Sequence, residues 1–318
     1  MNYRQLGRYG VKVSEVAVGG WLTHGRTIDD DTTSQIVHRA IELGINFFDT
    51  ADVYNRGEAE LALAKAIKDV KRESLFIATK CYFPMSDEPN DQGLSRKHIM
   101  ESAHNSLKRL ELDYVDLYQC HRNDMGVPVD ETVRAMDDLI KQGKILYWGV
   151  SEWPAYRIAQ ACHTAKELGC RPPVSNQPVY HMMQRYIEKE VLPACAHYGL
   201  GQVVFSPLAQ GILTGKYLPG QAPPEGSRGA DEKSNMFMGS LMSDENLTKV
   251  QALGKVAKKH GCSLPQFALA WCLRQQGVSA VIVGATKPEQ VEQNASASGL
   301  SLPDEAWAAA DAALGIES

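Results

Sequence analysis

The sequence predicts a closed parallel α/β barrel, the (β/α)8 TIM-barrel class, with an N-terminal β-hairpin and extra C-terminal helices. Short apolar runs of strand length recur along the chain, segments with helical periodicity separate them, and the first seven runs start 28 to 40 residues apart. That spacing is typical of one strand plus one helix, and near-continuous apolar strands are typical of parallel sheets covered on both faces. The runs are 16–20, 45–49, 75–80, 115–120, 145–150, 174–177, 202–206 and 280–284.

The first elements follow from turn and cap residues. Segment 1–14 carries two glycines in a polar stretch and is expected to form a hairpin that caps the barrel. The helices are predicted where apolar residues recur three and four positions apart. Ser95 is placed to cap one helix and Asp130 the next, while Gly44 and Gly169 stand where two others should end.

The spacing changes after the seventh run. Residues 207–243 are predicted to form a long loop that includes a stretch rich in glycine and proline. Two helical patterns, 247–257 and 267–273, follow it, and an alanine-rich helix at 303–314 ends the chain. A loop after strand seven lies at the C-terminal mouth of a parallel barrel, where active sites of this fold are built.

Composition excludes several classes of protein. The chain has 318 residues, of which 44% are hydrophobic and 22% charged, and we interpret residues 1–318 as one globular domain. A net charge of −5 does not suggest nucleic-acid binding. Neither a membrane segment nor a secretory signal is predicted. The seven cysteines include no Cys-x-x-Cys pair, so we expect free thiols, a cytoplasmic location and no metal site.

Polar residues gather where the predicted strands end. In a parallel barrel these positions share one rim. Each residue alone has an ordinary explanation as a helix cap, a packing group or a solvated charge, but together they favour a site. They are Asp49, Tyr54, Lys80, His121, Ser151, Gln177 and Ser206.

This set is suited to delivering a proton to a carbonyl oxygen. A free tyrosine, with a pKa of about 10, is a weak acid at neutral pH. We expect the ammonium of Lys80 to lower the pKa of Tyr54, with Asp49 holding Lys80 by an ion pair. His121 is expected to orient the carbonyl. No side chain supplies a hydride, so the site requires a cofactor.

The loops after strands seven and eight favour an anionic ligand. The chain has no Gly-x-Gly-x-x-Gly after a strand, and 211–216 is one residue too short for a Walker A loop. Phosphate sites of this barrel nevertheless lie at these two loops and a helix N-terminus. Lys216, Arg228 and Lys287 provide three cations there, and a solvated basic surface is the alternative explanation.

The motifs resemble those of the aldo-keto reductase superfamily. The resemblance spans nearly the whole chain and rests on Phe48–Tyr54, Thr79–Lys80, Cys120–His121, Gly149–Trp153, Asn176–Gln177, Ser206–Leu208, Gly211–Tyr217 and Pro288–Asn294. Gly93–Ile99, Glu131–Met136 and Tyr180–Met182 further resemble the branch that contains the potassium-channel β subunits and their bacterial relatives.

The resemblance implies NADPH-dependent reduction of aldehydes and ketones, with a small-molecule carbonyl substrate. Tyr54 is then the general acid, tuned by Lys80 and Asp49, and His121 orients the carbonyl. The residues implied for NADPH or NADP are Ser151, Gln177, Ser206, Leu208, Gly211, Lys216, Arg228, Lys287, Gln290 and Asn294. Trp21, Tyr82 and Phe83 are implied for the substrate pocket.

Other interpretations stay open. Channel β subunits tend to have Asn near the position of His121, which favours a working reductase over a redox-sensing, channel-associated regulatory subunit. Many relatives have Glu where Gln293 stands. This difference weakens the assignment of the adenine contact but leaves the implied chemistry unchanged. A barrel isomerase or lyase with Lys80 as a Schiff base is a third hypothesis. The substrate and the oligomeric state are open, although this branch often forms tetramers or octamers.

Overall fold

The computed structural model describes residues 1–231 and 234–316. Within these residues eight parallel strands close into a barrel in the order β10-β3-β4-β5-β6-β7-β8-β9, which confirms the predicted fold class. The strands are β3 (Val16–Gly19), β4 (Phe47–Asp49), β5 (Phe76–Cys81), β6 (Val115–Cys120), β7 (Ile145–Ser151), β8 (Ser175–Gln177), β9 (Gly201–Phe205) and β10 (Val278–Val283).

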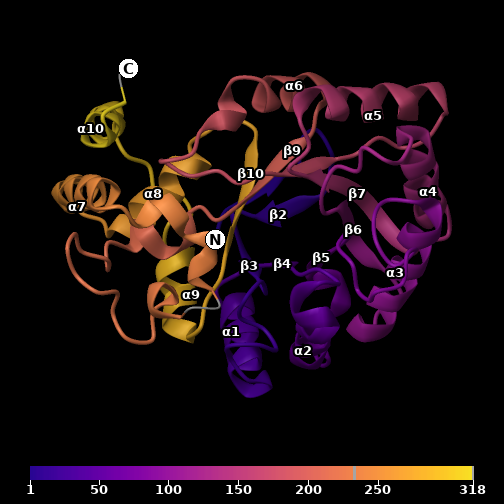
Figure 1. Cartoon of the computed structure of the whole chain (residues 1–318), viewed down its shortest axis with the longest axis horizontal. Coiled ribbons are helices and arrows are strands. Elements are labelled where there is room, and N and C mark those ends of the chain that lie inside the picture. The colour runs from indigo at the N-terminus through magenta and orange to yellow at the C-terminus, as the bar shows by residue number, and fades with distance from the viewer. Residues whose placement is uncertain (232–233, 317–318) are drawn as a thin grey trace.

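Helices surround the strands (Figure 1). They are α1 (Asp30–Glu42), α2 (Glu58–Ile67), α3 (Arg96–Leu110), α4 (Val129–Lys141), α5 (Ala155–Glu167), α6 (Val191–Tyr198), α7 (Asp244–Lys259), α8 (Leu264–Leu273), α9 (Pro288–Ala295) and α10 (Asp304–Leu314). Among the described helices, none has the length and hydropathy to cross a membrane.

The helix ends test the predicted caps. The hydroxyl of Ser95 accepts a hydrogen bond from the backbone N–H of His98, so this cap is confirmed. The cap expected at Asp130 is wrong, because α4 already begins at Val129 and Asp130 lies in its first turn. Its carboxylate still lies at the positive end of the helix dipole. Gly44 and Gly169 follow α1 and α5 with positive φ angles of 82° and 64°.

An antiparallel hairpin of β1 (Tyr3–Gln5) and β2 (Lys12–Ser14) closes the N-terminal end of the barrel. Leu6 and Val13 are fully buried and join the core inside the barrel. This core includes Phe47 and Phe76, which begin β4 and β5. Because the hairpin fills this end, ligands reach the interior from the opposite, C-terminal end of the strands.

The segment after β9 is more ordered than the predicted loop. In its described part, residues 209–242 form short 3₁₀ turns at Ala209–Thr214, Arg228–Ala230, Asn235–Phe237 and Gly239–Met242. The ring centre of Phe237 lies 4.9 Å from that of Trp21, which follows β3. In the closed barrel β10 lies between β3 and β9. The segment therefore reaches over part of the barrel mouth.

Candidate active site

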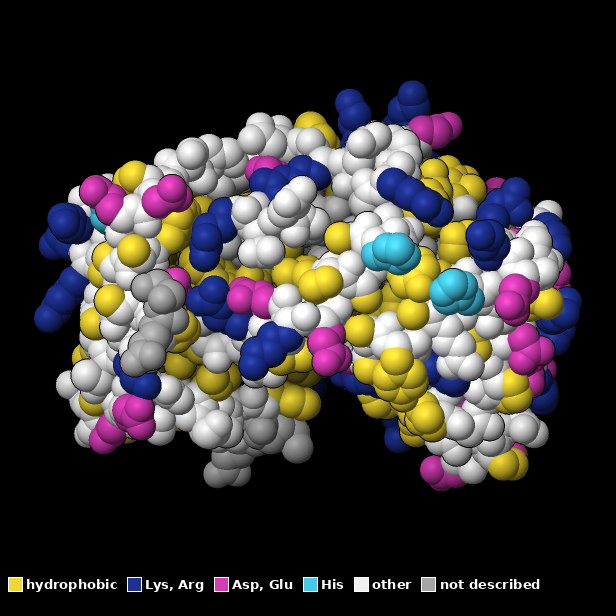
Figure 2. Space-filling view, turned by 90° about the horizontal axis from the view of Figure 1, so that it is seen from above, with side chains coloured by type: hydrophobic (Ala, Val, Ile, Leu, Met, Phe, Trp, Pro, Cys, Tyr) yellow, Lys and Arg dark blue, Asp and Glu magenta, His cyan; other side chains and the backbone are white. Residues whose placement is uncertain are grey.

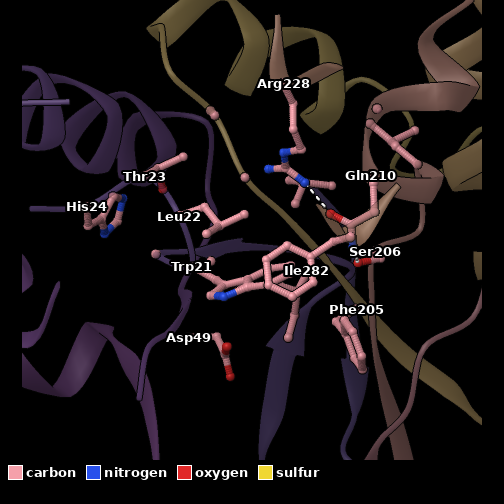
Figure 3. Close-up of a pocket in the computed structure, with 18 of the residues that line it drawn as sticks. Trp21, Leu22, Thr23, His24, Asp49, Phe205, Ser206, Gln210, Arg228 and Ile282 are labelled. Atoms are coloured by element: carbon pink, nitrogen blue, oxygen red, sulfur yellow. Dashed lines mark hydrogen bonds between the residues drawn. The ribbon is translucent and has the colours of Figure 1, made fainter. Parts of the chain in front are cut away.

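A cavity of about 940 Å³ lies at the C-terminal ends of the strands. Figure 3 shows Trp21, Asp49, Ser206 and Ile282 reaching it from β3, β4, β9 and β10 or from the residues that follow them. Residues predicted for the site that line this cavity are Trp21, Asp49, Tyr54, Phe83, His121, Ser151, Gln177, Ser206, Leu208, Gly211, Lys216, Arg228, Gln290 and Asn294.

Three predicted residues are not among those that line the cavity. Lys80 lies directly beneath it, fully buried, and hydrogen-bonds to Asp49 and Tyr54. Tyr82 packs against Phe83, with the ring centres 5.2 Å apart, and joins the edge of the core. Lys287 is exposed at the start of α9. The structure thus brings Lys80 into the site but neither Tyr82 nor Lys287 to the cavity wall.

Lys80 connects the carboxylate of Asp49 to the phenol of Tyr54. Its ammonium nitrogen Nζ donates to Asp49 Oδ2 at 2.6 Å, to the backbone oxygen of Thr50 at 2.8 Å and to Tyr54 Oη at 3.2 Å. An ammonium group has three protons, so these three acceptors use all of them. Tyr54 Oη therefore accepts from Lys80 and keeps its own proton to donate elsewhere.

Asp49 is held from its other oxygen by two glutamines. Oδ1 accepts from Gln177 Nε2 at 2.9 Å and from Gln119 Nε2 at 3.3 Å. The hydroxyl of Ser151 donates to the backbone oxygen of Gln177 at 2.8 Å. These bonds satisfy the buried carboxylate and set the positions of the side chains at the ends of β7 and β8.

Burial and the neighbouring charges together set the ionisation of Tyr54 and Lys80. Burial raises the pKa of Tyr54 above its ordinary value; the charge of Lys80 lowers it, but does not outweigh burial. The net decrease expected from the sequence is thus wrong in direction, because desolvation of the phenolate exceeds its attraction to the ammonium. Burial alone would lower the pKa of Lys80, but Asp49 and Tyr54 raise it on balance, so the amine stays protonated.

His121 completes the group around Tyr54. Its ring centre lies 5.6 Å from that of Tyr54 and 4.9 Å from that of Phe83. Burial, together with the charges of Lys80 and Arg122, holds the pKa of His121 well below its ordinary range. Its Nδ1 atom has no hydrogen-bond partner among the described residues. His121 is accordingly a neutral imidazole that is able to give one hydrogen bond to a ligand.

A strained turn positions Tyr54. The next three residues, Asn55, Arg56 and Gly57, have φ angles of 49°, 52° and 92°, and the first two carry side chains in a region that costs on the order of 1 kcal/mol per residue. Just before Tyr54, the carboxyl of Asp52 accepts a hydrogen bond from the hydroxyl of Ser102 on α3 at 2.7 Å. This hydrogen bond ties the turn to α3 and so holds Tyr54 at the cavity wall.

The opposite wall carries cations and a second strained turn. Ser206, Ala209, Gln210 and Gly211 all have positive φ angles, between 48° and 94°. The guanidinium of Arg228 hydrogen-bonds to the side-chain oxygen of Gln210, as Figure 3 shows, and lies 5.9 Å from the ring centre of Trp21. Lys216 also lines this side. Such a turn beside two cations suits a phosphate-bearing ligand.

Several cavity residues were not anticipated from the sequence. Arg122 follows His121 directly, so its position at a strand end was the available signal. Gln210 and Phe237 lie in the long loop, whose path no local pattern reveals. His24, in the loop after β3, is buried; its two ring nitrogens have no described partner, and burial lowers its pKa to about 4.

Comparison with known proteins identifies the family of the chain. The sequence model of the aldo/keto reductase family matches residues 15–314, and the chain belongs to this family. Membership of this family supports an activity in the oxidation or reduction of carbonyl compounds. Members of the family generally bind NADP(H).

Three relatives are named as potassium-channel subunits and not as reductases. A protein of Oryza sativa subsp. japonica and one of Arabidopsis thaliana, each named probable voltage-gated potassium channel subunit beta, are 42% identical over 300 residues, 93% of this chain and 91% of theirs. A Schizosaccharomyces pombe protein named putative voltage-gated potassium channel subunit beta is 45% identical over 303 residues, 93% of this chain and 87% of its own.

Proposed function

We propose that this protein is an NADPH-dependent reductase that converts aldehydes or ketones to alcohols, with Tyr54 as the proton donor. The observation that carries this proposal is the hydrogen bond from Lys80 to Tyr54 Oη at the cavity wall. Because Lys80 donates, the phenol proton is left for a carbonyl oxygen in the cavity. The raised pKa of Tyr54 keeps that proton in place at neutral pH.

The cavity fits NADPH in charge and size. Lys216 and Arg228 on one wall match the pyrophosphate and the 2′-phosphate, respectively, and no described carboxylate lies within 4.0 Å of either cation. The volume lies at the upper end of the range usual for ligand pockets. We assign the nicotinamide carboxamide to Ser151 and Gln177, the pyrophosphate path also to Ser206, Leu208 and Gly211, and adenosine to Gln290 and Asn294.

In the mechanism, bound NADPH supplies the hydride. Tyr54 Oη gives its proton to the carbonyl oxygen as negative charge develops there. Lys80 stabilises the phenolate that remains, and Asp49 keeps Lys80 charged and in place. His121, which is neutral, donates to the same carbonyl oxygen and fixes its direction. The raised pKa of Lys80 argues against its action as a Schiff-base nucleophile, which needs a neutral amine.

The substitution Tyr54→Phe tests the assignment because it removes the hydroxyl and keeps the ring. Aldehyde reduction is expected to fall by at least 100-fold, while NADPH binding, measured by fluorescence titration, changes little. Unchanged turnover would show that another group is the acid. Loss of NADPH binding would instead indicate a structural role for the phenol.

We propose a redox-sensing, channel-associated regulatory subunit as the second function, on the ground that the relatives carry channel-subunit names. That function predicts NADPH binding with negligible turnover and a stable complex with a membrane protein. A screen of aldehydes, ketones and quinones as oxidants of bound NADPH separates the two functions. We also propose that residues 1–318 work as one domain in the cytoplasm, which the seven unpaired cysteines support.

A further inference from the structure

The charged groups of the cavity are mostly cations. Among its described lining residues the charged side chains are Arg26, Asp49, Arg122, Lys216 and Arg228. Asp49 is paired with Lys80, so its charge is already neutralised. On the outer face shown in Figure 2, basic and acidic side chains are instead interspersed. The cavity is therefore specifically suited to anions.

Arg122 lies on the side of the cavity where the proton donor is. It follows β6, whereas Lys216 and Arg228, which the proposed function assigns to NADPH, follow β9. The guanidinium lies 5.4 Å from the ring centre of Phe83. Its Nη1 donates to the backbone oxygen of His121, which places it beside that residue. Its charge contributes to the lowered pKa of His121 and opposes part of the rise in the pKa of Tyr54.

Among the described residues, most of the hydrogen-bonding capacity of Arg122 has no partner. Nη1 donates to the backbone oxygen of His121 at 2.6 Å and contacts Ser151 Oγ at 3.5 Å. No bond from Nε or Nη2 to a described residue is present. A guanidinium offers five donors in a planar fork that matches a carboxylate or phosphate. Nη2 and Nε are the two nitrogens that remain for such a group.

The acids near Arg122 in the sequence and in space are committed to other partners. Asp124 accepts hydrogen bonds from the backbone N–H groups of Leu94 and Gly126. Glu152 accepts from the backbone N–H of Val179 and from the hydroxyl of Tyr186. Among the described residues, none offers a carboxylate within 4.0 Å of Arg122. A buried or half-buried arginine without an acid is favoured where a ligand supplies the anion.

We infer that the natural substrate is an anionic carbonyl compound, whose carboxylate or phosphate group is bound by Arg122 while Phe83 packs against its carbon skeleton. This inference rests on the proposed function, because it places the substrate beside Tyr54. Arg122 is a specificity residue here: it holds the far end of the substrate and takes no part in proton transfer.

Matched substrates test this inference. The wild-type protein is assayed with 4-carboxybenzaldehyde and with its neutral methyl ester, and separately with glyceraldehyde 3-phosphate and glyceraldehyde. The variants are Arg122→Gln, which removes the charge and keeps an amide donor, Arg122→Lys, which keeps the charge, and Arg134→Gln, which removes an exposed charge on α4 outside the cavity.

We expect kcat/KM of the wild type to favour at least one anionic member of the pairs. Arg122→Gln should reduce that preference by about 10- to 100-fold, mostly through KM, because a charged hydrogen-bonded pair is lost. The neutral substrates should lose much less than the anionic ones, because they form no ion pair with Arg122. Arg122→Lys should keep part of the preference, and Arg134→Gln should keep all of it. The pair that responds distinguishes a carboxylate from a phosphate substrate.

Equal loss for anionic and neutral substrates, or no anion preference in the wild type, would overturn the inference. A binding experiment separates this result from failure of the proposed function. Calorimetry of the protein loaded with oxidised NADP, which has no hydride to give, with 4-carboxybenzaldehyde and with its methyl ester reports anion recognition without turnover. Binding of the anion that Arg122→Gln weakens by about 10-fold or more supports the inference even if no aldehyde is reduced, and equal binding of acid and ester overturns it.

Discussion

The ammonium nitrogen of Lys80 lies 2.6 Å from Oδ2 of Asp49, and the two side chains are 0% and 3% exposed. Two opposite charges held so deeply in a protein cost several kcal/mol each in lost hydration, which their attraction and further hydrogen bonds must offset. Here those bonds come from Thr50, Gln119, Gln177 and Tyr54. Stability alone is a weak reason for such a pair, and its contact with Tyr54 is the part that serves chemistry.

Lys80→Met removes the ammonium and leaves Asp49 as an unpaired buried charge. We expect a loss of about 3 to 5 kcal/mol in the free energy of unfolding, measured with denaturant, and a fall in kcat of at least 100-fold. The double variant Asp49→Asn with Lys80→Met removes the unpaired charge as well. It should regain most of the stability but none of the activity; recovery of both would show that the ion pair has only a structural role.

The pH dependence of reduction follows from Tyr54 and His121. Burial raises the pKa of Tyr54 above 10.0 and, with the nearby positive charges, lowers that of His121 well below 6.5. A proton donor works only below its pKa, so activity is expected to fall only above about pH 10 and to stay level from pH 7 to 9. The profile of kcat/KM for an uncharged aldehyde provides the test, and an apparent pKa near 7 or 8 would contradict it.

Arg228→Gln tests the phosphate side of the cavity. Arg228 reaches the cavity between Gln210 and Trp21, and we assign it to the 2′-phosphate that distinguishes NADPH from NADH. The dissociation constant for NADPH should rise by about 10- to 100-fold and that for NADH by less than 3-fold, because only NADPH carries the extra charge. Fluorescence titrations with both cofactors measure this, with Arg134→Gln as a control. Equal weakening for both would remove Arg228 from the assignment.

Gly7 and Gly10 in the hairpin offer a matched pair for stability. Gly7 has a φ angle of 61°, and a Cβ added there would lie 2.3 Å from the backbone oxygen of Gly199; nothing lies within 4 Å of one added at Gly10. We expect Gly7→Ala to lower the free energy of unfolding by at least about 2 kcal/mol and Gly10→Ala to change it by less than about 0.5 kcal/mol. Similar effects at both positions would mean that the close approach of Gly7 to Gly199 does not require glycine.

Much of the fold was accessible from the sequence. Each apolar run became a strand within two residues of its predicted start, because β-branched and aromatic clusters report burial on both faces of a parallel sheet. The rim positions of Asp49, Tyr54 and His121 followed, since parallel strands all end on the same side. The cap at Asp130 was missed because a cap depends on where the backbone first becomes helical, which one position's side chain does not determine.

The sequence by itself thus determined the barrel, its hairpin and the set of residues at its mouth, since short-range patterns encode strand, helix and turn. Only the tertiary structure decided that burial outweighs Lys80 at Tyr54, that Tyr82 and Lys287 stay off the cavity wall, and that Arg122 meets no acid among the residues the structure describes. These properties depend on desolvation and on contacts between segments far apart in the chain, which no local pattern records.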